Sequence, residues 1–317
     1  MRTARSRLAV YAALTAAAFF WGSGFALARF ALRSISPLAM LAGQSLATAL
    51  AQIVWTLARG KLAELRLSRA DFFSVVGLGL VGQNILNGLT FWGLASTTAT
   101  NAALLYGISP VMIGMLAAVF LREPFSRRQA LGALVGFSGV ALIITQGNVA
   151  AIQLRGMMIG NLLVFGAAVY WSAYSVLTRR IAQRLQPQVY TFYLLTLGAV
   201  GPVALALGRE GRLPLFGLDA RTLAAVVVFG VATGTLGMNI WNWGLAQIEA
   251  SRVGAFSYLE PVFAAATAMA FLGEQVTLPT AVGAALVFAG IAFSTARQRR
   301  ARRAPEAVSP PGSVPDG

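Results

Sequence analysis

The chain of 317 residues is 57% hydrophobic and only 11% charged, and its mean hydropathy is +0.70. A soluble domain averages about 25% charged residues, so this composition excludes an ordinary water-soluble fold and indicates an integral membrane protein. The net charge of +15 does not indicate nucleic-acid binding, because the arginines lie at the ends of apolar segments and form no face with interleaved aromatic residues.

Ten apolar segments follow one another along the chain, each long enough to cross a bilayer as a helix. Helices are predicted because every backbone polar group must be bonded internally within lipid. The predicted fold class is therefore an all-α integral membrane protein with ten transmembrane helices. The segments cover about 8–30, 38–58, 72–94, 101–121, 129–146, 157–178, 188–207, 222–245, 253–272 and 279–296.

The first apolar segment has two interpretations. Arginines precede it and residues 26–28 resemble a cleavage site, which is typical of a secretory signal peptide. However, Trp171 of the sixth segment repeats Trp21 of the first at a spacing of 150 residues. The sixth segment lies in mid-chain and cannot be a signal, so we expect the first segment to be a retained helix.

The distribution of basic residues predicts the orientation. If the N-terminal residues 1–7 are cytoplasmic, most of the 25 lysines and arginines fall on the cytoplasmic side. Both termini are therefore expected in the cytoplasm, in an inner (plasma) membrane of the bacterial type. The basic C-terminal tail, 297–317, becomes rich in proline, glycine and serine and is expected to be disordered.

The chain contains an internal repeat, with halves at about 8–146 and 157–296. Each half holds five predicted helices, an odd number, so the second half enters the membrane from the opposite side. Inverted repeats are typical of alternating-access transporters, whose substrate site lies near the midplane between the halves. The alternative is a duplicated membrane scaffold without a transport role. The matching pairs, 150 or 151 residues apart, are Trp21 and Trp171, Pro37 and Pro187, Gly79 and Gly230, Trp92 and Trp243, Pro110 and Pro261, Glu123 and Glu274, Gly132 and Gly283, and Gly139 and Gly290.

Several short motifs in the two halves resemble those of a known family. They are Trp21-Gly22-Ser23, Ser109-Pro110-Val111, Leu121-Arg122-Glu123, Leu259-Glu260-Pro261-Val262 and Leu272-Gly273-Glu274. With the arrangement of five plus five helices, they resemble the EamA-like group of the drug/metabolite transporter superfamily over nearly all of 8–296. The resemblance implies a solute carrier of the inner membrane. It also favours export of an amino acid or a similar small metabolite.

Polar residues inside the segments are candidates for a substrate pathway, because such groups are unfavourable in lipid unless they face protein or water. Asn84 and Asn87 share a face of the third segment, as do Thr235, Asn239 and Asn242 in the eighth. The repeat superimposes these two faces, as a central pathway lined by both halves would require. Alternatively, the asparagines join helices by hydrogen bonds.

Two further stripes have residues spaced by four. Aromatic and hydroxyl groups at mid-helix can clamp a solute, although packing alone explains such stripes equally well. The stripes are Gln44, Thr48 and Gln52 in the second segment, and Tyr170, Tyr174 and Thr178 in the sixth.

Glu260 is the acidic residue that lies well inside an apolar segment. Such a carboxylate can carry a coupling proton or anchor a substrate ammonium group. Alternatively, it is structural and bonds a backbone carbonyl freed by Pro261. Pro110 and Pro261 are predicted to kink the fourth and ninth helices at equivalent positions and to act as hinges. The full set of predicted pathway residues is Trp21, Asn84, Asn87, Tyr174, Asn239, Asn242, Tyr258 and Glu260.

Catalysis is not expected. Residues 136–139 match the G-x-S-G pattern of intramembrane serine proteases, but the chain has no histidine to activate a serine and no cysteine. No phosphate-binding loop is present, and no cofactor or metal is expected. The expected partners are a small-molecule solute and the lipid bilayer, without nucleic acid. The glycine-rich fifth and tenth helices are expected to be peripheral supports or a homodimer contact.

Overall fold

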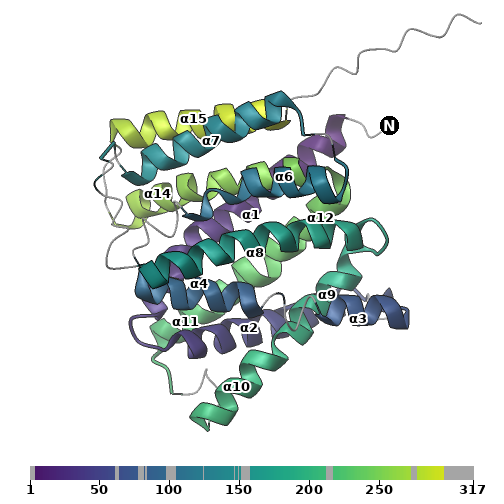
Figure 1. The fold of residues 1–317 in the computed structure, drawn as a ribbon. Coiled ribbons are helices and arrows are strands. Elements are labelled where there is room, and N and C mark those ends of the chain that lie inside the picture. Colours follow the sequence, from purple (N-terminus) through teal and green to yellow (C-terminus); the bar gives the residue numbers. More distant parts are fainter. Residues whose placement is uncertain are drawn as a thin grey trace, which may run out of the picture.

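The computed structural model describes residues 4–60, 64–77, 82, 84–97, 105–123, 125–145, 147–148, 150, 158–211, 217–272 and 277–295. Every regular element within these residues is a helix. The helices lie roughly side by side in a bundle, with α7 and α15 along one edge and α10 diverging at the other (Figure 1). The first half of the chain contains α1 (Ala4–Ala31), α2 (Pro37–Ala58), α3 (Arg69–Gly77), α4 (Asn84–Ser96), α6 (Ser109–Phe120) and α7 (Arg127–Thr145). The second half contains α8 (Met158–Ala182), α9 (Pro187–Gly198), α10 (Val200–Glu210), α11 (Ala220–Phe229), η4 (Gly230–Gly237), α12 (Met238–Gln247), α13 (Ala250–Gly254), η5 (Ala255–Tyr258), α14 (Leu259–Leu272) and α15 (Leu278–Thr295).

Local sequence signals determine where individual helices begin and end. The Ser36 hydroxyl accepts a hydrogen bond of 3.1 Å from the backbone N–H of Ala39, and Pro37 occupies the first turn of α2. Proline is tolerated there because the first N–H groups of a helix have no intrahelical acceptor. The chain leaves α2 through Gly60, whose φ of +63° favours glycine. Asp219 caps α11 by accepting hydrogen bonds from two backbone N–H groups.

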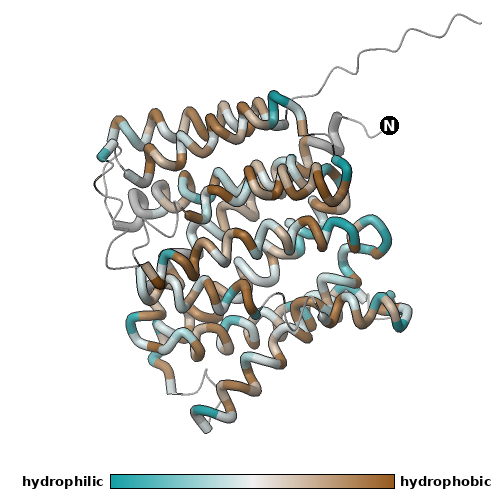
Figure 2. Tube along the Cα trace, viewed as in Figure 1, coloured by the Kyte–Doolittle hydropathy of each residue, from teal (hydrophilic) through white to brown (hydrophobic). Residues whose placement is uncertain are grey.

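Four helical stretches are long and apolar enough to cross a membrane, judged by length and composition within the described residues. Hydrophobic residues run along most of the helices, and hydrophilic residues gather at the turn that joins α8 to α9 (Figure 2). Bulky apolar side chains also lie exposed on the bundle, such as Val119 of α6 and Ile159 of α8, as expected for surfaces that contact lipid. The four stretches are Pro37–Ala58, Met158–Ala182, Pro187–Arg209 and Ala220–Gln247.

Several predicted segments differ in detail from the helices observed. The seventh is divided at Ala199 into α9 and α10, and the eighth contains the π-helix η4 between α11 and α12. The third corresponds to α3 and α4, and most of the residues between them lie outside the described part of the chain. The predicted disordered tail at 297–317 also lies outside it.

The glycine-rich helices α7 and α15 pack against each other along their length (Figure 1). A Cβ atom on Gly139 would lie 2.5 Å from the carbonyl oxygen of Gly283, and one on Gly290 would lie 2.6 Å from that of Gly132. Only glycine allows the two backbones to approach so closely. These glycines therefore serve a contact within the chain, whereas the predicted homodimer remains a prediction.

Candidate functional site

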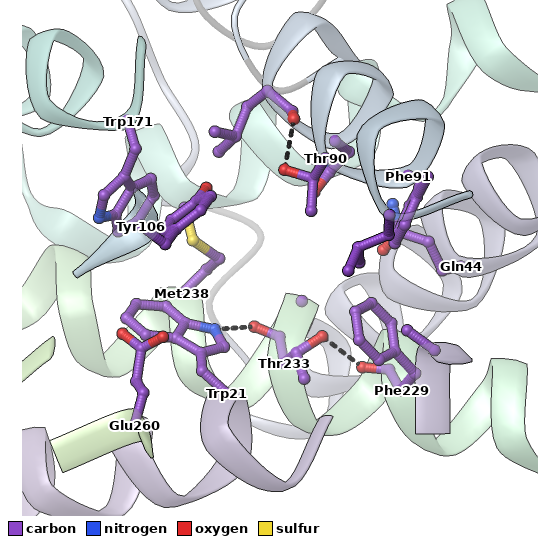
Figure 3. Close-up of a pocket in the computed structure, with 15 residues that line it drawn as sticks. Trp21, Gln44, Thr90, Phe91, Tyr106, Trp171, Phe229, Thr233, Met238 and Glu260 are labelled. Carbon is purple, nitrogen blue, oxygen red and sulfur yellow. Dashed lines mark hydrogen bonds between the residues drawn. The ribbon is translucent and has the colours of Figure 1, made fainter. Parts of the chain in front are cut away.

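A cavity of about 110 Å³ lies between helices from both halves of the chain (Figure 3). A water molecule needs about 10–15 Å³ of such space, so the cavity can hold several waters or a small solute. Its wall is largely apolar and aromatic with a few polar groups, which is the usual character of a small-molecule site. The lining residues are Trp21, Ala28, Gln44, Leu86, Asn87, Thr90, Phe91, Leu94, Tyr106, Trp171, Phe229, Thr233, Gly234, Met238 and Glu260.

Trp21 of α1 forms part of the cavity wall in a fixed orientation. Its indole Nε1 donates a hydrogen bond of 3.0 Å to the backbone carbonyl of Thr233. Its ring meets Trp171 of α8 edge to face, with centroids 5.4 Å apart, and lies 5.2 Å from Trp241 of α12. Trp171 and Trp241 are themselves 5.2 Å apart, so three tryptophans from three helices form one cluster beside the cavity.

The π-helix η4 brings the backbone of the eighth predicted segment against α2. A π-turn leaves carbonyl groups outside the ordinary α-helical ladder, and such turns are frequent at functional sites. Side chains of two other helices donate to carbonyls of η4: Thr48 Oγ1 donates to Gly230 over 2.8 Å, and Trp21 Nε1 donates to Thr233 over 3.0 Å. A Cβ on Gly234 would overlap the Thr48 side chain. The glycines of η4 therefore permit the close approach of α2 that closes this wall.

Glu260 enters the cavity from the first turn of α14. Its carboxylate lies beside the Trp21 ring, at the same end of the cavity as Tyr106 and Trp171 (Figure 3). On α1, Gly22 faces the backbone carbonyl of Glu260, and a Cβ atom at that position would overlap it.

Three of the predicted pathway residues line this cavity, namely Trp21, Asn87 and Glu260. Asn239 instead lines a second hollow of about 480 Å³, together with Gln52 and Trp243. The Asn239 Nδ2 atom donates to Gln52 Oε1 over 2.6 Å and to the Thr235 carbonyl over 2.7 Å. Asn239 therefore joins α12 to α2 and also faces a hollow.

The other four predicted residues lie outside both hollows and make packing contacts. Asn84 lies against Gly201 of α10. Tyr174 is buried and stacks on Trp171 with a centroid distance of 5.8 Å. The remaining two are hydrogen-bonded to neighbouring helices: Asn242 donates to Thr191 of α9 over 3.0 Å, and the Tyr258 hydroxyl donates to the Ala133 carbonyl of α7 over 2.9 Å.

The stripe of Gln44, Thr48 and Gln52 runs along α2 from one hollow to the other. Gln44 lines the cavity at Glu260, Gln52 lines the second hollow, and Thr48 lies between them on α2. The Thr48 carbonyl accepts a hydrogen bond of 3.0 Å from Thr235 Oγ1. Hydrogen bonds between α2 and the η4–α12 segment therefore separate the two spaces.

Pro110 and Pro261 occupy equivalent places in the fold. Pro110 lies in the first turn of α6, which follows a turn at 107–108. Pro261 lies in the first turn of α14, which follows the 3₁₀ segment η5. In both cases the proline lies in the first turn of the α-helix, where its missing N–H leaves no intrahelical bond unmade. Whether these breaks act as hinges remains a prediction.

The amino-acid sequence matches the model of the EamA-like transporter family twice, over residues 8–145 and 158–296. The chain belongs to the EamA-like transporter family. Curated relatives of similar length support this assignment. An uncharacterized transporter of Bacillus subtilis, YyaM, is 30% identical over 286 residues, which cover 90% of this chain and 92% of the relative.

Another relative of this EamA-like protein has a more specific name. A protein of Streptantibioticus cattleyicolor named "Probable terminal-alkyne amino-acid exporter" is 29% identical over 291 residues, covering 92% of this chain and 94% of that protein. A solved crystal structure shares the fold with a TM-score of 0.76 at 22% identity, covering 90% of this chain and 96% of the other. This likeness concerns the fold alone.

Some cavity residues of this EamA-like protein were not predicted from the sequence. Thr90, Tyr106, Phe229 and Met238 line the cavity beside the predicted residues. Tyr106 precedes Pro110 by one helical turn, so its place next to the break in the fourth segment is the signal that could have identified it. The other three are ordinary helical residues, and only the packing of their helices turns them toward the cavity.

Proposed function

We propose that this EamA-like protein is a secondary transporter that moves a small organic metabolite, an amino acid or a similar compound, out across the inner membrane. The observation that carries the proposal is the cavity at Glu260, because helices from both halves of the chain build it. A site between two halves is the place where alternating access binds a solute. Both termini lie in the cytoplasm in this proposal, in agreement with the distribution of basic residues.

Contacts between equivalent positions support a mechanism in which two inverted five-helix halves rock around the cavity. Trp21 contacts Trp171, its own counterpart in the repeat. Under the repeat, Gly132 corresponds to Gly283 and Gly139 corresponds to Gly290. The contact between Gly132 and Gly290 is therefore equivalent to the contact between Gly283 and Gly139. A two-fold axis between the halves would produce both features. Rocking about this axis would break the hydrogen bonds that separate the two hollows and join them into a path.

Export rather than uptake is proposed from the name of the Streptantibioticus relative, which describes an exporter. Coupling to protons is proposed from Glu260, because a carboxylate in a membrane cavity can bind and release a proton during the cycle. An enzymatic function lacks support in the site. The hydroxyl of Ser138 in the G-x-S-G pattern donates to the Leu134 carbonyl of its own helix over 2.9 Å and lies exposed on α7.

The test is transport by the purified full chain in liposomes, with a panel of radiolabelled amino acids and small amines and with or without a pH gradient. Flux of at least one solute above that of protein-free liposomes is expected, and a pH gradient should increase it. Absence of flux for every solute would contradict the proposal and favour a membrane scaffold. If the Glu260→Gln variant transports normally and its response to pH is unchanged, Glu260 does not couple transport to protons.

A further inference from the structure

The cavity has two chemically different ends (Figure 3). Glu260 lies at one end beside the ring of Trp21, and the ring of Tyr106 lies at the same end. Gln44 lies at the other end together with Phe91 and Phe229. A ligand that fills the cavity therefore meets a carboxylate and aromatic rings at one pole and a neutral amide group at the other. Between them lie Met238, Thr90 and Thr233, and the two threonine hydroxyls donate to carbonyls of the preceding helical turn.

The charged side chain that lines the cavity is acidic, without a described basic residue to balance it. Among the described residues that line the cavity, Glu260 is acidic and none is a lysine or an arginine. The ion pairs found in the described part of the chain involve Glu123 and Glu249. A carboxylate inside a membrane protein is normally paired with a cation or with a proton. The cation that completes this site can therefore come from the ligand.

The rings near Glu260 suit a cation for a second, independent reason. The face of an aromatic ring attracts an ammonium group, and tryptophan does so most strongly. The hydrogen bond to the Thr233 carbonyl and the contact with Trp171 hold the Trp21 ring in place before any ligand arrives. A ring that is already oriented loses little conformational entropy on binding, so the site is preorganised for an ammonium group.

A zwitterionic α-amino acid fits this arrangement less well than an amine. Its carboxylate is attached to the carbon that carries the ammonium group, so both groups would enter the same end of the cavity. There the ligand carboxylate would meet Glu260, a like charge, without a described arginine or lysine to pair with. The amide of Gln44 lies at the opposite end of the cavity from Glu260, away from the end where both groups would enter (Figure 3).

We propose that the cavity selects an organic monocation: an amine with an apolar body that lacks a carboxylate beside the amino group. The ammonium group pairs with Glu260 between the rings of Trp21 and Tyr106, the apolar body fills the middle, and a neutral polar group, where present, reaches Gln44. This inference rests on the proposed transport function and narrows its substrate class from amino acids to amines and amino acids whose carboxylate is masked as an amide or an ester.

The experiment measures binding of radiolabelled phenethylamine to the purified full chain, with unlabelled competitors that share its phenyl body. Phenethylamine and phenylalanine amide are expected to compete well, phenylalanine about ten-fold or more weakly, and 3-phenylpropionate not at all. Glu260→Gln should lose about ten-fold or more in affinity, and Glu260→Asp should retain part of it. Ser138→Ala, on the exposed surface of α7, is the matched control that should bind as the wild type does.

Transport of the same compounds in liposomes separates the inference from the function on which it rests. If phenylalanine is transported and competes more strongly than phenethylamine, the proposed selectivity for amines is overturned. The proposed transport function would still stand. Absence of binding and flux for all four compounds would overturn the inference, and the wider solute panel then decides the function. Thermal unfolding of each variant shows whether it is folded. If Glu260→Gln does not fold, the affinity of Glu260→Asp still tests the inference.

Discussion

Arg179 of α8 forms an ion pair with Glu123, which follows α6, and the Nε and Oε1 atoms are 3.2 Å apart. The second carboxylate oxygen accepts a hydrogen bond of 2.8 Å from the backbone N–H of Ala250, at the start of α13. Arg179 also donates to the Leu245 carbonyl, near the end of α12. The anion thus lies at a helix start and the cation at a helix end, which are the positions that the helix dipoles favour. The pair connects the two halves of the chain.

Replacing Arg179 by alanine should destabilise the protein, because it leaves the largely buried Glu123 carboxylate without its cation. The side chains of Arg179 and Glu123 are 14% and 9% exposed. Removal of one partner from a buried pair costs about 3 kcal/mol in the free energy of unfolding. The measurement is the unfolding transition in detergent, with Arg184→Ala on the exposed turn after α8 as the control. Equal stability of the two variants would show that the pair contributes nothing.

The stability of the pair should depend on pH through Glu123. Burial raises the pKa of this carboxyl group above its ordinary value, and the Arg179 guanidinium and the N–H groups of Ala250 and Ser251 offset only part of the shift. Between the ordinary and the raised pKa, the folded state holds a proton that the unfolded state has lost. The contribution of Glu123 to stability therefore decreases as the pH rises through this window.

Comparison of the wild type with Glu123→Gln tests this dependence. The melting temperature of the wild type relative to that of the variant should fall as the pH rises from below the ordinary glutamate pKa, about 4.3, to neutrality. A difference that stays constant over this range, or that grows with pH, would contradict the raised pKa. The variant itself should show the smaller pH dependence, because its amide does not titrate.

The contact between α7 and α15 should not tolerate a methyl group at its glycines. A Cβ on Gly290 would lie 2.5 Å from the backbone nitrogen of Gly136 and 2.6 Å from the Gly132 carbonyl oxygen, so the helices must move apart. Overpacking of this kind costs about 1–3 kcal/mol. Gly208→Ala in α10 is the control, because nothing lies within 4 Å of its added Cβ. Unfolding measurements should show Gly290→Ala destabilised and the control unchanged or slightly more stable.

Cysteine labelling should separate the predicted pathway residues into two classes. The chain has no native cysteine, so single cysteines can be introduced without a background. Asn87→Cys lies in the cavity wall and should react with a small water-soluble maleimide. Asn242→Cys should stay unreactive in the folded protein, because Asn242 is fully buried between α12 and α9. Labelling of position 242 at the rate of position 87 would place it on a solvent path and contradict its packing role.

Much of this protein was determined by its sequence alone. Hydropathy depends on the local composition, so the apolar helices and the membrane class could be predicted without tertiary contacts. The constant spacing between the halves identified Trp21 and Trp171 as counterparts, and they meet in the structure. Glu260 was a candidate because an acidic residue inside an apolar segment is exceptional, and it lines the cavity.

Only the tertiary structure decided which polar residues face the cavity. Helical periodicity placed Thr235, Asn239 and Asn242 on one face, but they contact Thr48, Gln52 and Thr191 on two different helices. Thr235 and Asn239 both meet α2, whereas Asn242 lies three residues after Asn239 in the same helix, about 60° around its axis, and meets α9, so one polar face contacts two neighbouring helices. The glycines of the π-helix η4 also pack closely against α2, which is a contact between distant parts of the chain. A local sequence pattern contains no information about such a contact, so the separation of cavity residues from packing residues arises only when the helices assemble.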